Sequence, residues 1–150
     1  MIGTLPAELS LLTGLKRFLA PENSLRGDLD VAFGGISSLQ TLALPDNRLT
    51  GPIPTGILEM NPDLSLLAIG GNQFTGTIPL SLAGATKLTD LQLYGNSLTG
   101  EIPTDIGALS PLCKSDGLMC FPLLFNSNQT VVLLVLFSYS FLYSEYRVTR

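Results

Sequence analysis

A glycine that recurs at a nearly constant spacing is the strongest constraint on what this chain can fold into. The glycines at positions 3, 27, 51, 76 and 100 are separated by 24, 24, 25 and 24 residues. Leu49-Thr50-Gly51 and Leu98-Thr99-Gly100 enclose two of them, and Phe74-Thr75-Gly76 and Leu25-Arg26-Gly27 are close variants. A fixed period of this length indicates a repeat architecture, in which each unit buries its apolar face against its neighbours.

Several other columns keep the same register. Asparagine recurs at Asn23, Asn47, Asn72 and Asn96. A Leu/Ile-Pro pair follows four of the glycines, at Leu5-Pro6, Ile53-Pro54, Ile78-Pro79 and Ile102-Pro103. Apolar residues precede each asparagine at fixed distances, as Leu15/Phe18/Ala20, Leu39/Leu42/Leu44, Leu64/Leu67/Ile69 and Leu88/Leu91/Leu93. We therefore expect residues 1–112 to form one solenoid of about four and a half units.

The chemistry of each column predicts its place in the unit. The last two apolar residues of L-x-x-L-x-L stand two apart, as on one face of a strand, so each unit should give one short strand with its apolar side inward. A buried asparagine then turns the chain, and its amide satisfies backbone groups that no neighbouring strand reaches. Stacked units should build an asparagine ladder. The glycine permits a backbone conformation that is costly for other residues, and the following proline fixes its own φ.

The pattern L-x-x-L-x-L-x-x-N-x-L-T-G-x-I-P resembles the plant- and algal-type leucine-rich repeat, over roughly residues 3–112. The resemblance implies an α/β repeat solenoid, a right-handed superhelix with a parallel β-sheet on its concave side. It implies short 3₁₀ or irregular segments on the convex side, with extra strand segments around the I-P element. It also implies a recognition role, most often in receptor-like proteins, receptor-kinase ectodomains and inhibitors of secreted enzymes.

Two units depart from the pattern. The second reads Gly27-Asp28-Leu29-Asp30-Val31, where aspartate replaces the usual proline, and we expect one weakened convex turn. The third carries one extra residue near Glu59-Met60-Asn61-Pro62, which a loop can absorb. The chain opens in the middle of a unit, without the cysteine-containing cap that is usual in the family and without a signal-peptide pattern. This start suggests a fragment or a truncated gene.

The segment 113–150 is a non-repeat hydrophobic tail. Cys113 and Cys120 could form a cap disulfide in an oxidising compartment, or remain two unpaired thiols. Residues 130–143 are apolar, but as a helix they would span about 21 Å against a bilayer core of about 30 Å. A marginal membrane segment, a cap on the open solenoid end and an aberrant gene end all remain open. Asn128 begins a glycosylation sequon, which matters only in the secretory pathway.

Composition argues against catalysis and against nucleic acid. There is no histidine, so the commonest general base and metal ligand are missing. The net charge is −4 and charged residues make up 13% of the chain, whereas nucleic-acid binding needs a clustered basic surface. The two cysteines cannot complete a zinc site by themselves. The sequence predicts no enzyme, no metal and no cofactor.

Function should lie on the concave sheet, on the residues that alternate outward between buried leucines. Those positions are Lys16, Arg17, Leu19, Gln40, Thr41, Ala43, Ser65, Leu66, Ala68, Thr89, Asp90 and Gln92, with Glu22, Asp46 and Tyr94 on the turn side. Among them the ligand-binding candidates are Lys16, Arg17, Gln40, Asp46, Asp90, Gln92 and Tyr94. Arg17 and Tyr94 are favoured because arginine and tyrosine are common in binding hot spots.

The expected partner is a protein or peptide ligand on the concave face. Three alternatives remain open: an intracellular scaffold, an inhibitor of a secreted glycan-degrading enzyme, and a truncated fragment without separate function. The location follows from the N-terminus. An incomplete N-terminus favours a membrane-bound, cell-surface or secreted protein, and a complete one favours the cytoplasm.

Overall fold

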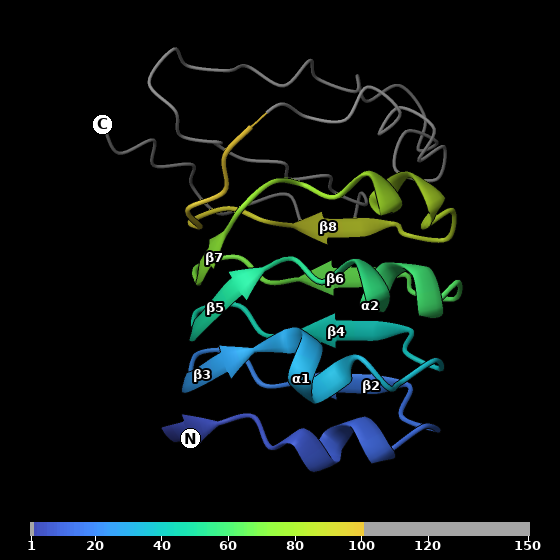
Figure 1. Ribbon diagram of the computed structural model, residues 1–150, viewed down its shortest axis with the longest axis horizontal. Coiled ribbons are helices and arrows are strands. Elements are labelled where there is room, and N and C mark those ends of the chain that lie inside the picture. The colour runs from blue at the N-terminus through green and yellow to red at the C-terminus, as the bar shows by residue number, and fades with distance from the viewer. Residues whose placement is uncertain (1, 101–150) are drawn as a thin grey trace, which may run out of the picture.

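The computed structural model describes residues 2–100, which wind into a stack of similar coils (Figure 1). Each coil passes through a strand of a first sheet, a tight turn, a strand of a second sheet and a short helical segment. The first sheet contains β2 (Arg17–Leu19), β4 (Thr41–Ala43), β6 (Leu66–Ala68) and β8 (Asp90–Gln92). The second contains β1 (Ile2–Thr4), β3 (Ser24–Asp28), β5 (Arg48–Pro52) and β7 (Gln73–Thr75).

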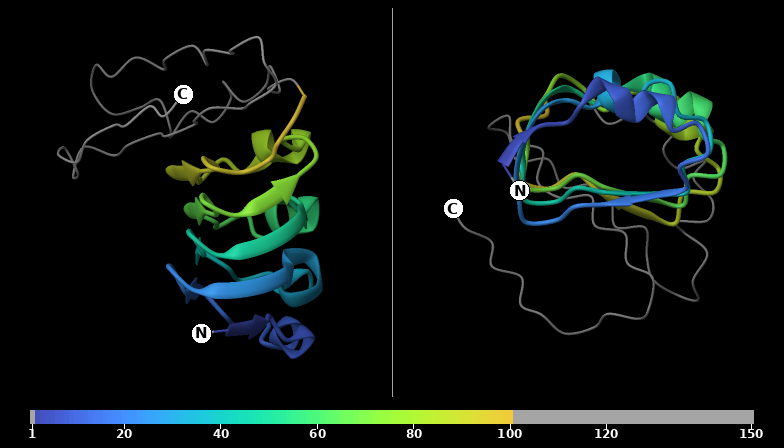
Figure 2. Two further views of the ribbon diagram at one scale, coloured as in Figure 1. Left: turned by 90° about the vertical axis from the view of Figure 1, so that its left-hand side faces the viewer. Right: turned by 90° about the horizontal axis from the view of Figure 1, so that it is seen from below.

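Both sheets are parallel and follow the order of the coils. The strand orders are β2-β4-β6-β8 and β1-β3-β5-β7, so every strand pairs with the equivalent strand of the next coil. Viewed along the stack, each coil is a flattened ring with the first sheet on one long side and the helical segments on the other (Figure 2). The leucine-rich-repeat solenoid predicted from the sequence is confirmed.

The helical side is more regular than the sequence analysis expected. It holds two 3₁₀ helices, η1 (Ala7–Leu11) and η2 (Leu80–Gly84), but also two short α-helices, α1 (Leu29–Phe33) and α2 (Thr55–Met60). Helix α1 lies where a weakened turn was expected. Asp28 caps it, because its side-chain oxygen accepts a hydrogen bond of 2.8 Å from the Asp30 backbone N–H. Asp30 holds the proline position of this unit, and α1 begins one residue before it, after the cap Asp28.

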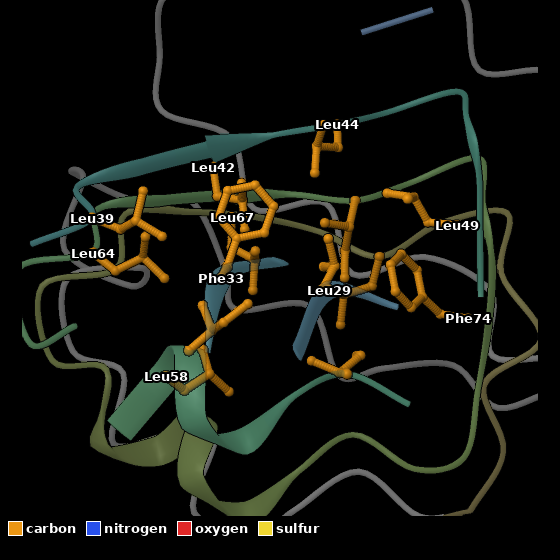
Figure 3. Close-up of a cluster of buried hydrophobic side chains, with 14 of the residues drawn as sticks. Leu29, Phe33, Leu39, Leu42, Leu44, Leu49, Leu58, Leu64, Leu67 and Phe74 are labelled. Atoms are coloured by element: carbon orange, nitrogen blue, oxygen red, sulfur yellow. The ribbon is translucent and has the colours of Figure 1, made fainter. Parts of the chain in front are cut away.

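The core is one continuous apolar column between the first sheet and the helical side (Figure 3). The middle residue of each later strand, Leu42, Leu67 or Leu91, is at most 2% exposed. Phe33 of α1 and Phe74 of β7 fill the column from its other sides and are fully buried. Stacking thus buries the face that a single unit would leave in water.

Some predictions concern residues outside the described range. These are the solenoid segment after residue 100, the tail at 113–150, the cysteine pair Cys113 and Cys120, the sequon at Asn128 and the apolar run at 130–143. Across residues 2–100, no helix is both long and apolar enough to cross a membrane.

Candidate binding surface

The outward side of β2, β4, β6 and β8, which we call the strand face, carries two rows of side chains in register. One row aligns Arg17, Thr41, Leu66 and Asp90, and the other aligns Leu19, Ala43, Ala68 and Gln92. Strands in a sheet lie about 4.8 Å apart, so Arg17 and Asp90 are separated by about 14 Å along their row. Between them stand only Thr41 and Leu66.

The strand face is uneven in exposure. Lys16 and Arg17 are exposed, and Leu19 keeps 55% of its surface in solvent. Gln40, Asp90 and Gln92 are half-buried. Ala68 was expected among the outward positions, but it is only 4% exposed. Ala68 lies in the row between Ala43 and Gln92, and at this exposure it offers little surface to a ligand.

The charges on the strand face are not neutralised by one another. Over residues 2–100 the ion pair formed is Lys87 with Asp63, and neither lies on this face. Burial raises the pKa of the Asp90 carboxyl, and a side-chain hydrogen bond from Thr89 offsets part of that effect. The face therefore has two free cations at one end and a partly desolvated carboxylate at the other.

The turn that follows the first sheet bends the backbone into the left-handed region in successive coils. The residue before each ladder asparagine has φ of 51° at Glu22, 55° at Asp46, 63° at Gly71 and 61° at Gly95. Glycine adopts this conformation freely, whereas Glu22 and Asp46 adopt it at a cost in backbone strain. This strained turn conformation places the carboxylates of Glu22 and Asp46 along the edge of the strand face.

Asp46 and Tyr94 come together at this edge, although they belong to different coils. The Tyr94 ring packs over Gly70, where an added Cβ would lie 2.5 Å from the ring Cε1. Asp46 lies against Gly71 in the same way. Burial raises the pKa of the Tyr94 hydroxyl, and the negative charge of Asp46 raises it further. The sequence analysis named Asp46 and Tyr94 as ligand-binding candidates, but it did not identify the Gly70-Gly71 pair against which they pack.

The asparagine columns bind the coils to one another. Asn72 Oδ1 accepts from the Leu49 N–H at 3.0 Å, and its Nδ2 donates to the Leu44 carbonyl at 2.9 Å. Asn47 and Asn96 make equivalent bonds to the preceding coil. Asn47 and Asn72 are 7% exposed, whereas Asn23 and Asn96 are half-buried.

A further buried asparagine was not identified from the sequence. Asn61, at the extra residue of the third unit, is fully buried at the end of α2. Its Oδ1 accepts from the Leu39 N–H at 2.7 Å, and its Nδ2 donates to the carbonyls of Ile36 and Ile57 at 2.9 Å. The sequence feature that could have identified it is the Asn61-Pro62 step at this insertion, but the insertion was interpreted only as a loop. Asn61 is structural, and it links two coils on the side opposite the strand face.

Nothing in the described residues is arranged as a metal site. No cluster of three or more histidine, cysteine, aspartate or glutamate side chains occurs between residues 2 and 100. The polar groups of the strand face lie along rows instead of converging on one point. This arrangement suits the recognition of an extended surface.

Comparison with known proteins places the chain among repeat proteins of the same kind. The family model described as Leucine Rich Repeat matches residues 87–109. No curated protein sequence matches the chain. Among solved structures, a TDR receptor is 40% identical with a TM-score of 0.67. The match covers 71% of this chain and 18% of the receptor chain.

Two other plant receptors are similar. The ectodomain of the receptor kinase GASSHO1/SCHENGEN3 from Arabidopsis thaliana is 35% identical, with a TM-score of 0.68, covering 73% of this chain and 13% of that one. The plant peptide hormone receptor RGFR1 is 32% identical, with a TM-score of 0.70, and the match covers 74% of this chain and 18% of the receptor chain.

The repeat columns, the two parallel sheets and these likenesses define a leucine-rich-repeat solenoid. Its repeats are leucine-rich repeats, and the chain is similar to plant leucine-rich-repeat receptor ectodomains. It spans less than a fifth of the length of the three receptors described above.

Proposed function

We propose that this chain is a non-catalytic binding scaffold whose strand face holds a protein or peptide ligand in an extended conformation. The observation that carries the proposal is the separation of unpaired charge on that face. Lys16 and Arg17 lie at one end, Asp90 lies at the other, and small or neutral side chains form the floor between them. A ligand with complementary charges would gain from both ends at once.

The size of the strand face fits an extended segment. The row from Arg17 to Asp90 measures about 14 Å, which an extended peptide crosses in about four or five residues at about 3.4 Å each. The Asp46–Tyr94 corner adds an aromatic ring and a carboxylate at one edge. Tyrosine supplies contact area with a polar tip, which is why it is common in hot spots.

The similar receptors support a peptide as the ligand class. GASSHO1/SCHENGEN3 was solved in complex with CASPARIAN STRIP INTEGRITY FACTOR 2, and RGFR1 in complex with RGF2. RGFR1 is described as a peptide hormone receptor, so a solenoid similar to this one binds a ligand of the peptide class. We extend that role to the present chain on the strength of its own strand face.

Selection from a random peptide display library on the immobilised full chain tests the proposal. Enriched peptides should compete with one another, carry acidic residues toward one end, and lose about tenfold or more in affinity on Arg17→Glu. The matched control is Arg48→Glu, which reverses an arginine on the second sheet and should leave binding unchanged. Peptides that ignore Arg17→Glu, or that bind elsewhere on the chain, would contradict the proposal.

A further inference from the structure

A groove on the second sheet brings two arginines together. It has a volume of about 450 Å³ and is lined by Arg26, Gly27, Arg48, Thr50 and Gln73. Arg26 of β3 and Arg48 of β5 are direct register partners, and Thr50 is the register partner of Gln73 of β7. Since neighbouring strands lie about 4.8 Å apart, both guanidinium groups start from adjacent points on the same surface.

This pairing of like charges is not compensated within the described residues. Neither Arg26 nor Arg48 forms an ion pair in the range 2–100, and both are exposed. Like charges at opposite positions on paired strands destabilise a sheet. The acidic residue of β3, Asp28, instead uses its Oδ1 to cap helix α1. In a chain of net charge −4, these two arginines form a second place of uncompensated positive charge in the range 2–100, besides Lys16 and Arg17 on the strand face.

The lining offers hydrogen-bond donors from three strands. The two guanidinium groups present fixed forks of N–H donors, Thr50 adds a hydroxyl and Gln73 adds an amide. Among residues 2–100, no carboxylate lines the groove. Donors that come from three strands can surround a tetrahedral group of oxygens. Hydrogen bonds from an arginine to an anionic oxygen are charge-assisted, and they are stronger than hydrogen bonds between neutral groups.

We propose that this groove is a binding site for a tetrahedral oxyanion, a phosphate or sulfate group. The site lies on the second sheet, uses none of the strand-face residues, and does not depend on the peptide-binding function proposed above. Its ligand would relieve the repulsion between Arg26 and Arg48. The anion is either free in solution or the ester group of a larger ligand, and the two sources share this chemistry.

Titration of the full chain with inorganic sulfate and with inorganic phosphate, followed by backbone amide chemical shifts, tests the site. Chloride at matched ionic strength is the blank. The expected result is saturable shifts confined to the amides around the five lining residues. Arg26→Gln and Arg48→Gln should each weaken binding about tenfold, because a charge-assisted hydrogen bond is worth at least that factor. The matched control Arg17→Gln, on the strand face, should leave the affinity unchanged.

Three outcomes overturn the proposal: shifts that never saturate, shifts that follow every basic side chain, and equal losses for Arg17→Gln and Arg48→Gln. Both groove variants should keep the melting temperature or raise it slightly, because removing one arginine relieves repulsion. If either glutamine variant fails to fold, Arg26→Lys and Arg48→Lys replace it. These keep the charge but lose the bidentate fork, and should still bind more weakly. Comparison of phenyl phosphate with inorganic phosphate separates the two sources, since an ester site prefers the former.

Discussion

The side-chain amides of a few asparagines hold the coils together. A backbone N–H or carbonyl that turns away from its sheet and is buried must find another partner. Asn72 and Asn61 supply such partners at two different corners of the coil, and both are nearly inaccessible to water. On the strand face, by contrast, burial of the Asp90 carboxyl disfavours its charged form and raises its pKa.

Asn61→Ala should be strongly destabilising. The change leaves the Leu39 N–H and the carbonyls of Ile36 and Ile57 without their side-chain partner in a site closed to water. We expect a loss of about 3 kcal/mol in the free energy of unfolding, measured by denaturant titration. Asn96→Ala is the control: Asn96 is half-buried, so water can reach its partners and the loss should be smaller. Equal losses for the two variants would contradict the role given to burial.

Asp90→Asn should stabilise the protein at neutral pH. Because the folded-state pKa of Asp90 is raised, the folded chain holds its proton more tightly than the unfolded chain does. Stability from this group is therefore full below the unfolded pKa and falls as pH rises through the folded pKa. The variant should melt at a higher temperature than the parent at pH 7, and at the same temperature in acid below the unfolded pKa.

The control for this pH effect is Asp63→Asn. Asp63 is exposed and paired with Lys87, so the change removes the same charge together with an ion pair. No gain in melting temperature is expected from it. A gain of the same size in both variants would mean that net charge, and not the burial of Asp90, sets the effect.

Single residues also show how far the sequence could predict this structure. The columns predicted the inward leucines and the register of the asparagines, because those positions repeat and repetition reveals their environment. Asn61 does not repeat, so nothing in the columns marked it as buried. The contact of Tyr94 with Gly70 depends on a ring from one coil meeting a missing side chain in another, which no single unit shows.

At the scale of elements, the helical side shows how one unit can begin a helix differently from the rest. Segments η1, α2 and η2 begin after Pro6, Pro54 and Pro79, which have φ between −71° and −72° and make no side-chain cap. Helix α1 begins after Asp28, whose carboxylate accepts from the Asp30 N–H. Proline fixes the backbone at the start, whereas aspartate satisfies one of the free N–H groups there.

Asp28→Ala should therefore destabilise the protein by about 1 kcal/mol, as the loss of a helix cap does. Asp28→Asn keeps an oxygen in the same place and should cost much less, since asparagine is an equally good cap. The measurement is hydrogen exchange at the backbone amides of residues 30–34, which should speed up in the alanine variant alone. If exchange accelerates equally in both variants, the charge of Asp28 matters here and not its hydrogen bond. If neither variant exchanges faster, the cap does not stabilise α1.

On the scale of the whole molecule, the two sheets give the solenoid two distinct surfaces. The alternation of leucines predicted the strand face, because that face is simply the outward side of the repeated strand. The second sheet was expected only as extra strand segments, and its groove was not expected. Arg26 and Arg48 occupy different columns of the repeat, and the register of the parallel strands, offset from the repeat period, makes them neighbours.

The continuous core predicts that damage to an inner coil spreads along the stack. Leu64 and Leu15 occupy the same column, but Leu64 is 1% exposed whereas Leu15 is only partly buried. Leu64→Ala should cost about 2–5 kcal/mol, the usual range for a buried leucine, and Leu15→Ala clearly less. Because neighbouring coils stabilise one another, Leu64→Ala should accelerate the exchange of the most protected amides in both sheets, β4 and β5 included. Acceleration confined to the coil of β6 would mean that the coils unfold independently.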